Sequence, residues 1–335
     1  MSVEIWIGIA LTMLAGMMAG NCMLPSKFVK RWNWENLWLV FTLVSLVIGP
    51  WTLALWKIPG IIDLYSDMPG EKFILPLVFG FGWGIAQILF GLSVARLGMA
   101  LSYAVIIGLG SLLGTLVPLV FQRREVLQTG KGVLILAGLT VMICGILVSG
   151  RAGRLREASA GASAKASGYA GALVLAVLCG LMAPMLNYSF AFGQGFAEEA
   201  IRRGVTPADA GYAVWPVGLT GGLIPNIGYA IYLIARNKTH GAFRPVQPDV
   251  IFPVLMGILW MGSMAVYGVA AVYLGALGTS VGWALFQIFM IMTANLSGVL
   301  TGEWRLAGRQ ALRILSTGLA LLAAATVVIS LGNSL

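Results

Sequence analysis

The chain has 335 residues, 59% of them hydrophobic and 10% charged, and its mean hydropathy is +0.91. This composition excludes a soluble globular protein, which needs far more polar surface, and indicates an integral membrane protein. The net charge of +9 comes from basic residues scattered between apolar runs, not from a basic stripe with interleaved aromatic residues. We therefore expect no nucleic-acid partner.

Long uncharged runs predict the membrane-spanning segments, because a helix needs about 20 apolar residues to cross a bilayer. The N-terminal run follows no basic residue, so we interpret it as the first span and not as a cleaved signal peptide. The longest run is divided by Gly275-Ala276-Leu277-Gly278 into two spans. The sequence thus predicts an all-α polytopic membrane protein with ten transmembrane helices. The runs are residues 5–26, 36–56, 73–95, 97–122, 132–150, 166–197, 210–235, 250–302 and 314–335.

Basic residues are twice as frequent in the odd-numbered loops between these spans as in the even-numbered loops. Cytoplasmic loops are enriched in Lys and Arg, so we expect the odd loops in the cytoplasm and both termini on the other side. The basic side chains also suit contact with anionic membrane lipid. The odd loops carry Lys27, Lys30, Arg31, Arg96, Arg151, Arg154, Arg156, Lys165, Arg236, Lys238, Arg244, Arg305, Arg309 and Arg313. The even loops carry Lys57, Lys72, Arg123, Arg124, Lys131, Arg202 and Arg203.

A seven-point pattern occurs twice, which indicates an internal duplication. The first copy is Pro76, Gly80, Trp83, Phe90, Gly91, Leu97 and Gly98, and the second is Pro253, Gly257, Trp260, Tyr267, Gly268, Leu274 and Gly275. We predict an N-terminal five-helix repeat (1–150), a cytoplasmic linker rich in Arg, Ala, Gly and Ser (151–168), and a C-terminal five-helix repeat (169–335). Because five is odd, the repeats have opposite orientations, and such inverted repeats support transport by alternating access.

Small residues one helical turn apart predict close contacts between helices. Gly80-x3-Gly84 and Gly218-x3-Gly222 are two such pairs within predicted spans. Without side chains, these positions let neighbouring helix backbones approach closely.

Several motifs spread over most of the chain indicate a family. They are Pro25-x-Lys27-x2-Lys30-x-Trp32-x-Trp34-Glu35-x2-Trp38, Trp83-Gly84-Ile85, Leu97-Gly98-Met99, Cys179-Gly180, Asn226-x-Gly228, Trp260-x6-Tyr267 and Glu303-Trp304-x3-Gly308-Arg309. In these motifs the chain resembles the bacterial L-rhamnose/proton symporter family of the drug/metabolite transporter superfamily.

The resemblance implies ten helices in two inverted repeats, located in the bacterial inner membrane. It also implies import of L-rhamnose or a similar 6-deoxyhexose by proton symport. The alternative is an uncoupled facilitator, or an exporter of another small polar metabolite. We expect no enzyme, no catalytic residues, no cofactor and no metal site, since the sequence has no HExxH, Walker A or Ser/His/Asp pattern. The sequence carries no signal for an oligomeric state.

A proton-coupled carrier is expected to hold a titratable group at membrane depth, yet all 12 Asp and Glu residues lie in loops or near the ends of predicted spans. Glu35 is the first candidate for proton coupling, because three neighbouring tryptophans would desolvate it and raise its pKa. The alternative is a first-turn glutamate that stabilises the helix dipole. Glu199 is the second candidate, and Glu303 is another on the same reasoning.

Amide side chains within the spans are the first candidates for binding a sugar, because they donate and accept hydrogen bonds together. In hydrocarbon an unpaired amide costs on the order of several kcal/mol, so each needs an explanation. We expect Gln87 and Gln287 to contact the substrate because they lie centrally in their spans, followed by Asn187 with Tyr188, and Asn226. The alternative for each is a hydrogen bond between helices.

Two further amides receive a structural interpretation. Asn21 lies at the end of the first span and is expected to cap it, and Asn295 near the end of the ninth is expected to bond to a neighbouring helix.

Aromatic residues supply the apolar platform that a sugar ring needs. Trp83 and Trp260 occupy equivalent positions in the two repeats, and an inverted fold would place them on opposite sides of a sugar. The alternative is packing against nearby glycines. Tyr267 follows Trp260 on the same helix face and adds a hydroxyl. Six tryptophans near span ends are expected to anchor at the membrane interface. They are Trp32, Trp34, Trp38, Trp51, Trp56 and Trp304.

Overall fold

The computed structural model describes residues 3–159, 169–243 and 248–334, and every regular element within these ranges is helical. Ten of its helical stretches are long and apolar enough to cross a membrane, which confirms the predicted all-α fold with ten spans. The α-helices are α1 (Val3–Asn21), α2 (Trp34–Leu43), α3 (Gly49–Lys57), α4 (Ile61–Asp67), α5 (Glu71–Leu97), α6 (Met99–Gln122), α7 (Gly130–Ser159), α8 (Tyr169–Met182), α9 (Met185–Phe192), α10 (Gln194–Arg202), α11 (Pro207–Ala210), α12 (Trp215–Asn237), α13 (Ile251–Tyr273), α14 (Val281–Leu300) and α15 (Arg309–Ser334). The shorter turns are η1 (Leu24–Phe28), η2 (Val44–Ile48), η3 (Arg124–Gln128), η4 (Gly211–Ala213), η5 (Thr239–Phe243), η6 (Pro248–Val250) and η7 (Gly275–Leu277).

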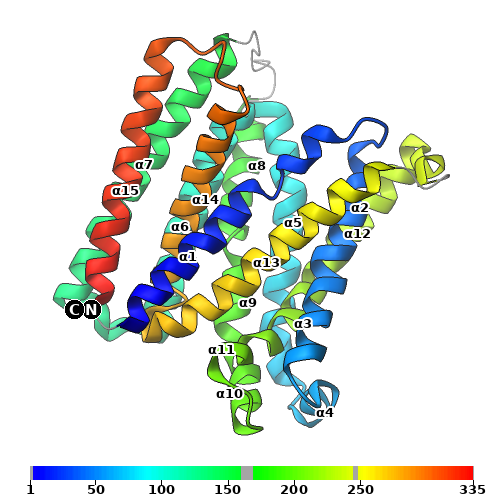
Figure 1. The fold of residues 1–335 in the computed structure, drawn as a ribbon, viewed down its shortest axis with the longest axis vertical. Coiled ribbons are helices and arrows are strands. Elements are labelled where there is room, and N and C mark those ends of the chain that lie inside the picture. Colours follow the sequence, from blue (N-terminus) through cyan, green and yellow to red (C-terminus); the bar gives the residue numbers. More distant parts are fainter. Residues whose placement is uncertain (1–2, 160–168, 244–247, 335) are drawn as a thin grey trace.

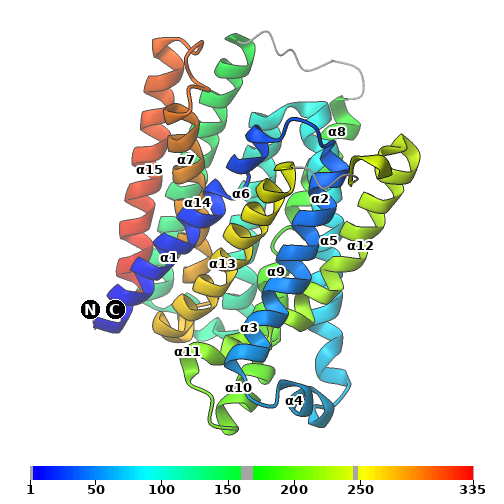
Figure 2. The same ribbon diagram turned by 45° about the vertical axis from the view of Figure 1, so that its right-hand side comes forward.

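The chain crosses the molecule back and forth between two ends (Figures 1 and 2). We call the end where α1, α5, α7, α12 and α14 finish the odd-loop end, which is at the top of Figure 1. The opposite, even-loop end carries α4, α10 and both chain ends. The predicted division at residues 275–278 is confirmed, since η7 separates α13 from α14 there.

The second and sixth spans are each built from several helical pieces, with proline or glycine at the breaks. The second span consists of α2, the π turn η2 and α3, and Pro50 lies at the start of α3. The sixth span consists of α8, α9 and α10, and it is broken before α9 at Pro184 and before α10 at Gly193. Proline has no backbone N–H to donate within a helix, so it interrupts the regular hydrogen-bond ladder.

The predicted glycine contacts form the seam between α5 and α12. A Cβ atom on Gly80 would lie 1.9 Å from the carbonyl oxygen of Gly218, and one on Gly84 would lie 2.7 Å from that of Gly222. Neither contact leaves room for a side chain, so the two backbones touch directly. The close approach predicted from the small-residue pairs is confirmed.

The predicted linker is partly helical. Helix α7 continues to Ser159, so residues 151–159 belong to the fifth span's helix and not to a flexible segment. The physical reason is local, because this stretch contains Ala, Arg, Leu and Glu, which favour helices. The rest of the predicted linker, residues 160–168 with Lys165, lies outside the described residues, as does Arg244.

Candidate functional site

Trp83 of α5 and Trp260 of α13 lie against each other. Their rings stack with centroids 5.3 Å apart and an angle of 24° between planes, and both side chains are buried. Phe41 packs edge-on against Trp260. The two rings are in direct contact with each other in this structure. A contact between the sugar and either ring stays a prediction.

Asn187 and Tyr267 form a fully buried hydrogen-bond network. The Tyr267 hydroxyl donates to Asn187 Oδ1 at 2.6 Å. The Asn187 amide donates in turn to the backbone carbonyls of Gly114 at 3.0 Å and Thr279 at 2.8 Å. The network ties α6, α9, α13 and the start of α14 together in the even-loop half. Its geometry matches the alternative interpretation of these residues, hydrogen bonding between helices.

Asn226 also bonds to another helix. Its Oδ1 accepts from the Trp38 indole N–H at 3.0 Å, and its amide donates to the Gly222 carbonyl of its own helix at 2.8 Å. The bond joins α2 to α12. Tyr188, the remaining aromatic candidate, is buried and packs edge-on against Phe79.

Gln87 and Gln287 are different, because neither side chain makes a hydrogen bond within the described part of the chain. Gln87 is half-buried on α5, one turn beyond Trp83, and Gln287 is buried on α14. An amide without a partner in a membrane protein is costly. A sugar bound beside these two residues would satisfy their free donors and acceptors.

The first two candidates for proton coupling, Glu35 and Glu199, lie at opposite ends of the molecule. Glu35 is buried in the first turn of α2, where its carboxylate accepts from the Asn237 amide and the Thr239 hydroxyl, each at 3.0 Å. Glu199 on α10 forms ion pairs with Arg202 and Arg203. Both carboxylates are therefore already held by donors.

A cavity of about 420 Å³ opens at the odd-loop end, between spans one, four, five and nine. This volume falls within the range of small-molecule sites, roughly 300 to 1,000 Å³. None of the eight residues predicted to bind substrate lines it. The cavity is lined by Gly20, Asn21, Met23, Leu24, Ser26, Lys27, Met99, Tyr103, Ala104, Ile107, Ile146, Ser149, Gly150, Gly153, Arg156, Ile291, Ala294, Asn295, Ser297, Gly298, Glu303 and Trp304.

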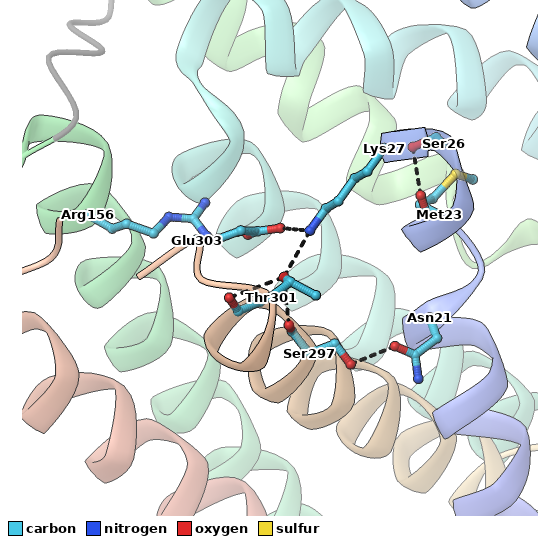
Figure 3. A network of polar contacts seen from close by, with 9 residues as sticks. Asn21, Met23, Ser26, Lys27, Arg156, Ser297, Thr301 and Glu303 are labelled. Carbon is cyan, nitrogen blue, oxygen red and sulfur yellow. Dashed lines mark hydrogen bonds and ion pairs between the residues drawn. The ribbon is translucent and has the colours of Figure 1, made fainter. Parts of the chain in front are cut away.

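Charged side chains from three segments meet at the mouth of this cavity (Figure 3). The Glu303 carboxylate lies between Lys27 of η1 and Arg156 of α7, and it pairs with both, at 2.8 Å to the Arg156 guanidinium. Lys27 also donates to the Thr301 hydroxyl at 3.2 Å. Burial of Glu303 opposes ionisation, but the hydrogen bonds and positive charges of Lys27 and Arg156 outweigh it and lower its pKa. The carboxylate is therefore ionised at neutral pH.

Below the mouth, Asn21 connects α1 to α14. Its Oδ1 accepts from the Ser297 hydroxyl at 2.6 Å, and its amide donates to the Met17 carbonyl in its own helix. Asn295 donates to the Ile291 carbonyl of its own helix at 2.9 Å, so the expected bond to a neighbouring helix is wrong. Its Oδ1 has no partner among the described residues.

Two tryptophans expected at the membrane interface are buried instead. Trp38 is held by Asn226, and Trp304 packs under the Arg156 guanidinium, 5.1 Å from its ring centroid. A position near the end of a span does not distinguish an interface anchor from a residue covered by a neighbouring loop. Trp34 and Trp56 are exposed, as an interface position requires.

Ten helical stretches that can span a membrane, with a polar-rimmed cavity between four of them, define a multi-pass membrane protein. A family model described as the L-rhamnose-proton symport protein matches residues 1–334, and the chain belongs to this family.

Curated relatives and a solved structure cover most of the chain. The L-rhamnose-proton symporter of Mannheimia succiniciproducens is 29% identical over 320 residues, 92% of each chain. That of Escherichia coli O1:K1 / APEC is 29% identical over 341 residues, 99% of each chain. A solved crystal structure at 17% identity covers 98% of this chain and 96% of its own, with a TM-score of 0.54. That likeness concerns the fold alone.

Proposed function

We propose that the protein imports L-rhamnose, or a similar 6-deoxyhexose, across the bacterial inner membrane by proton symport. The observation that carries this proposal is the family match over residues 1–334, together with near full-length relatives named L-rhamnose-proton symporters. The free amides of Gln87 and Gln287 support recognition of a polyhydroxylated substrate. The odd-loop end faces the cytoplasm in this proposal, as the distribution of basic residues predicts.

Alternating access is supported by the difference between the two ends. The odd-loop end holds an open cavity. In the even-loop half, the hydrogen bonds of Asn187 and Tyr267 hold the helices together. The helix contacts are also compatible with an inverted repeat. Helix α5 packs on α12 as α13 packs on α2, and α1 packs on α13 as α8 packs on α5. An inverted repeat offers two related conformations, one open to each side.

Uptake into proteoliposomes tests the proposal. Purified full-length protein should accumulate labelled L-rhamnose above equilibrium when the outside is more acidic than the inside, and a protonophore should abolish the accumulation. Uptake that only reaches equilibrium would replace the symporter by the uncoupled facilitator. Absence of L-rhamnose uptake under all conditions would reject the substrate.

Single substitutions test the predicted roles. Gln87→Ala and Gln287→Ala should each weaken sugar binding, measured as loss of the thermal stabilisation that a ligand confers by mass action. Glu35→Gln and Glu199→Gln test proton coupling. A coupling residue, once neutralised, should abolish uphill accumulation and leave equilibrium exchange of L-rhamnose intact.

A further inference from the structure

The lining of the odd-loop cavity changes character with depth. Charged groups lie at its mouth, where Lys27, Arg156 and Glu303 pair. Further in, the lining includes the polar side chains of Tyr103 and Asn295. Because a helix rises about 1.5 Å per residue, the lining residues furthest from the helix ends lie some 10 to 15 Å below the mouth.

These deepest residues are three isoleucines on three different helices. Ile107 comes from α6, Ile146 from α7 and Ile291 from α14, and they are 9%, 4% and 9% exposed. All three belong to a single apolar cluster. We call them the isoleucine floor. A polar group pressed against this floor would lose water and find no side-chain partner there.

The polar level above the floor has unused hydrogen-bonding groups. The Tyr103 hydroxyl and Asn295 Oδ1 make no hydrogen bond with any described residue. Glu303 is an ionised acceptor one level higher, at the mouth of the same cavity. Acceptors, a hydroxyl and cationic donors thus surround the upper part of the cavity, and a hydrocarbon surface closes the lower part.

A 6-deoxyhexose has the same polarity along its length, with ring hydroxyls at one end and a methyl group at C6. We propose that the odd-loop cavity binds the sugar with its C6 methyl against the isoleucine floor and its hydroxyls toward Tyr103, Asn295 and Glu303. The floor thereby selects the 6-deoxy sugar over the same sugar with a C6 hydroxyl. This inference rests on the proposed function. Gln87 and Gln287 do not line the cavity, so the inference adds a second binding position for the sugar, on the odd-loop side, and the basis of its specificity.

The size of the selection follows from the cost of burying a hydroxyl. An apolar pocket rejects a ligand that adds one hydroxyl by up to roughly 100-fold, because the group loses its water without gaining a partner. L-Mannose differs from L-rhamnose only in this hydroxyl. We therefore expect wild-type protein to prefer L-rhamnose by about 10-fold to 100-fold.

The test measures binding of both sugars to purified full-length protein in lipid, and competition for uptake into proteoliposomes. Ile107→Thr offers a partner to the C6 hydroxyl and should reduce the preference to within a few-fold. The matched control is Ile106→Thr, since Ile106 is the adjacent residue, is also buried, and lies in a different apolar cluster away from the cavity. It should leave the preference unchanged. Ile291→Thr repeats the test from another helix.

A second control separates affinity from selectivity. Tyr103→Phe removes a hydroxyl from the polar level and should weaken L-rhamnose and L-mannose equally, so that their ratio stays the same. Equal affinity of wild-type protein for the two sugars would overturn the inference. So would an unchanged ratio in both Ile107→Thr and Ile291→Thr.

Failure of the proposed function has a different signature. If wild-type protein neither binds nor transports L-rhamnose, the same comparison is made with L-fucose and L-galactose, which also differ only at the C6 hydroxyl. A preference for L-fucose that Ile107→Thr removes would uphold the floor and reject L-rhamnose as the substrate. Absence of preference in both sugar pairs would reject the floor itself.

Discussion

The two ends of the molecule are held together by different kinds of contact. At the odd-loop end, Glu303 bridges Lys27 and Arg156 across a cavity mouth, and its side chain is 36% exposed. At the even-loop end, Asn187 and Tyr267 bond in a site that water does not reach. Exposed ion pairs exchange easily with water and are individually weak, whereas breaking a buried hydrogen-bond network leaves its members unpaired.

The odd-loop end should therefore open more readily than the even-loop end. Ion pairs at a wet mouth can break and re-form with little change in free energy, because water replaces the lost partner. The buried network can open only if its helices move together and its groups find other partners. A carrier that alternates therefore has to rebuild the even-loop packing in its other conformation.

The largest effect is expected where backbones touch. Gly80→Ala places a Cβ 1.9 Å from the Gly218 carbonyl oxygen, so α5 and α12 must separate. We expect a loss of about 3 kcal/mol or more in the free energy of unfolding. Gly91→Ala is the control on the same helix, since its Cβ meets nothing within 4 Å. Thermal unfolding in detergent measures both, and equal stability of the two variants would contradict the seam.

Asn187 and Asn295 are buried or half-buried amides in the even-loop and odd-loop halves of the molecule. Asn187→Leu removes three hydrogen bonds and leaves the Tyr267 hydroxyl buried without its short bond. We expect a loss of about 2 to 3 kcal/mol. Asn295→Leu removes one bond within its own helix beside the cavity and should cost below about 1 kcal/mol. A reversed order of the two melting temperatures would show that the even-loop network does not hold the fold.

A double-mutant cycle sharpens the same point. Tyr267→Phe alone removes the donor to Asn187 and should cost about 1 kcal/mol. In the Asn187→Leu background the same change should cost nearly nothing, because the partner is already gone. Additive losses in the free energy of unfolding would mean that the two side chains act independently.

The smallest effect on stability is expected at the cavity mouth. Glu303→Gln removes a carboxylate whose pKa is lowered below its ordinary value of 4.5 by Lys27 and Arg156. Because the side chain is more than a third exposed, its ion pairs should contribute about 1 kcal/mol or less. A depressed pKa stabilises the fold above pH 4.5, and this contribution is lost as the pH falls through the lowered folded value.

The melting temperatures of wild type and Glu303→Gln should therefore differ by a constant amount above pH 5 and converge below pH 4.5. Added salt should reduce the difference, since exposed pairs are screened. A difference that grows as the pH falls would contradict the assigned ion pairs.

Much of the architecture could be predicted from local sequence. The apolar runs predicted ten spans, Gly275 to Gly278 marked the division between α13 and α14, and the paired glycines predicted the seam between α5 and α12. Each of these depends on the hydropathy or size of residues close together in the chain. The continuation of α7 beyond residue 150 was missed, because Arg and Ser were interpreted as linker residues although the stretch also favours a helix.

The candidate site was predicted only in part. Residue type indicated that Asn187, Asn226, Gln87 and Gln287 were all suited to a sugar, but type alone does not say which are already bonded. Lys27 and Arg156 were interpreted through membrane topology, and Asn295 through helix packing. A signal was available in Glu303, an acidic residue in a loop that also carries Arg305. Nothing in the local sequence showed that Glu303 meets Lys27 and Arg156.

The sequence by itself determined the number of spans and the membrane environment, because transfer of each segment into a bilayer depends on that segment alone. It also determined the family, through motifs whose residues lie close together in the chain. The tertiary structure decided which polar groups are satisfied and which are free. Glu303 meets a lysine 276 positions away, and Asn187 meets a tyrosine 80 positions away. Hydrogen-bond satisfaction belongs to pairs of groups brought together by packing, so the cavity and its isoleucine floor emerge only when spans one, four, five and nine assemble.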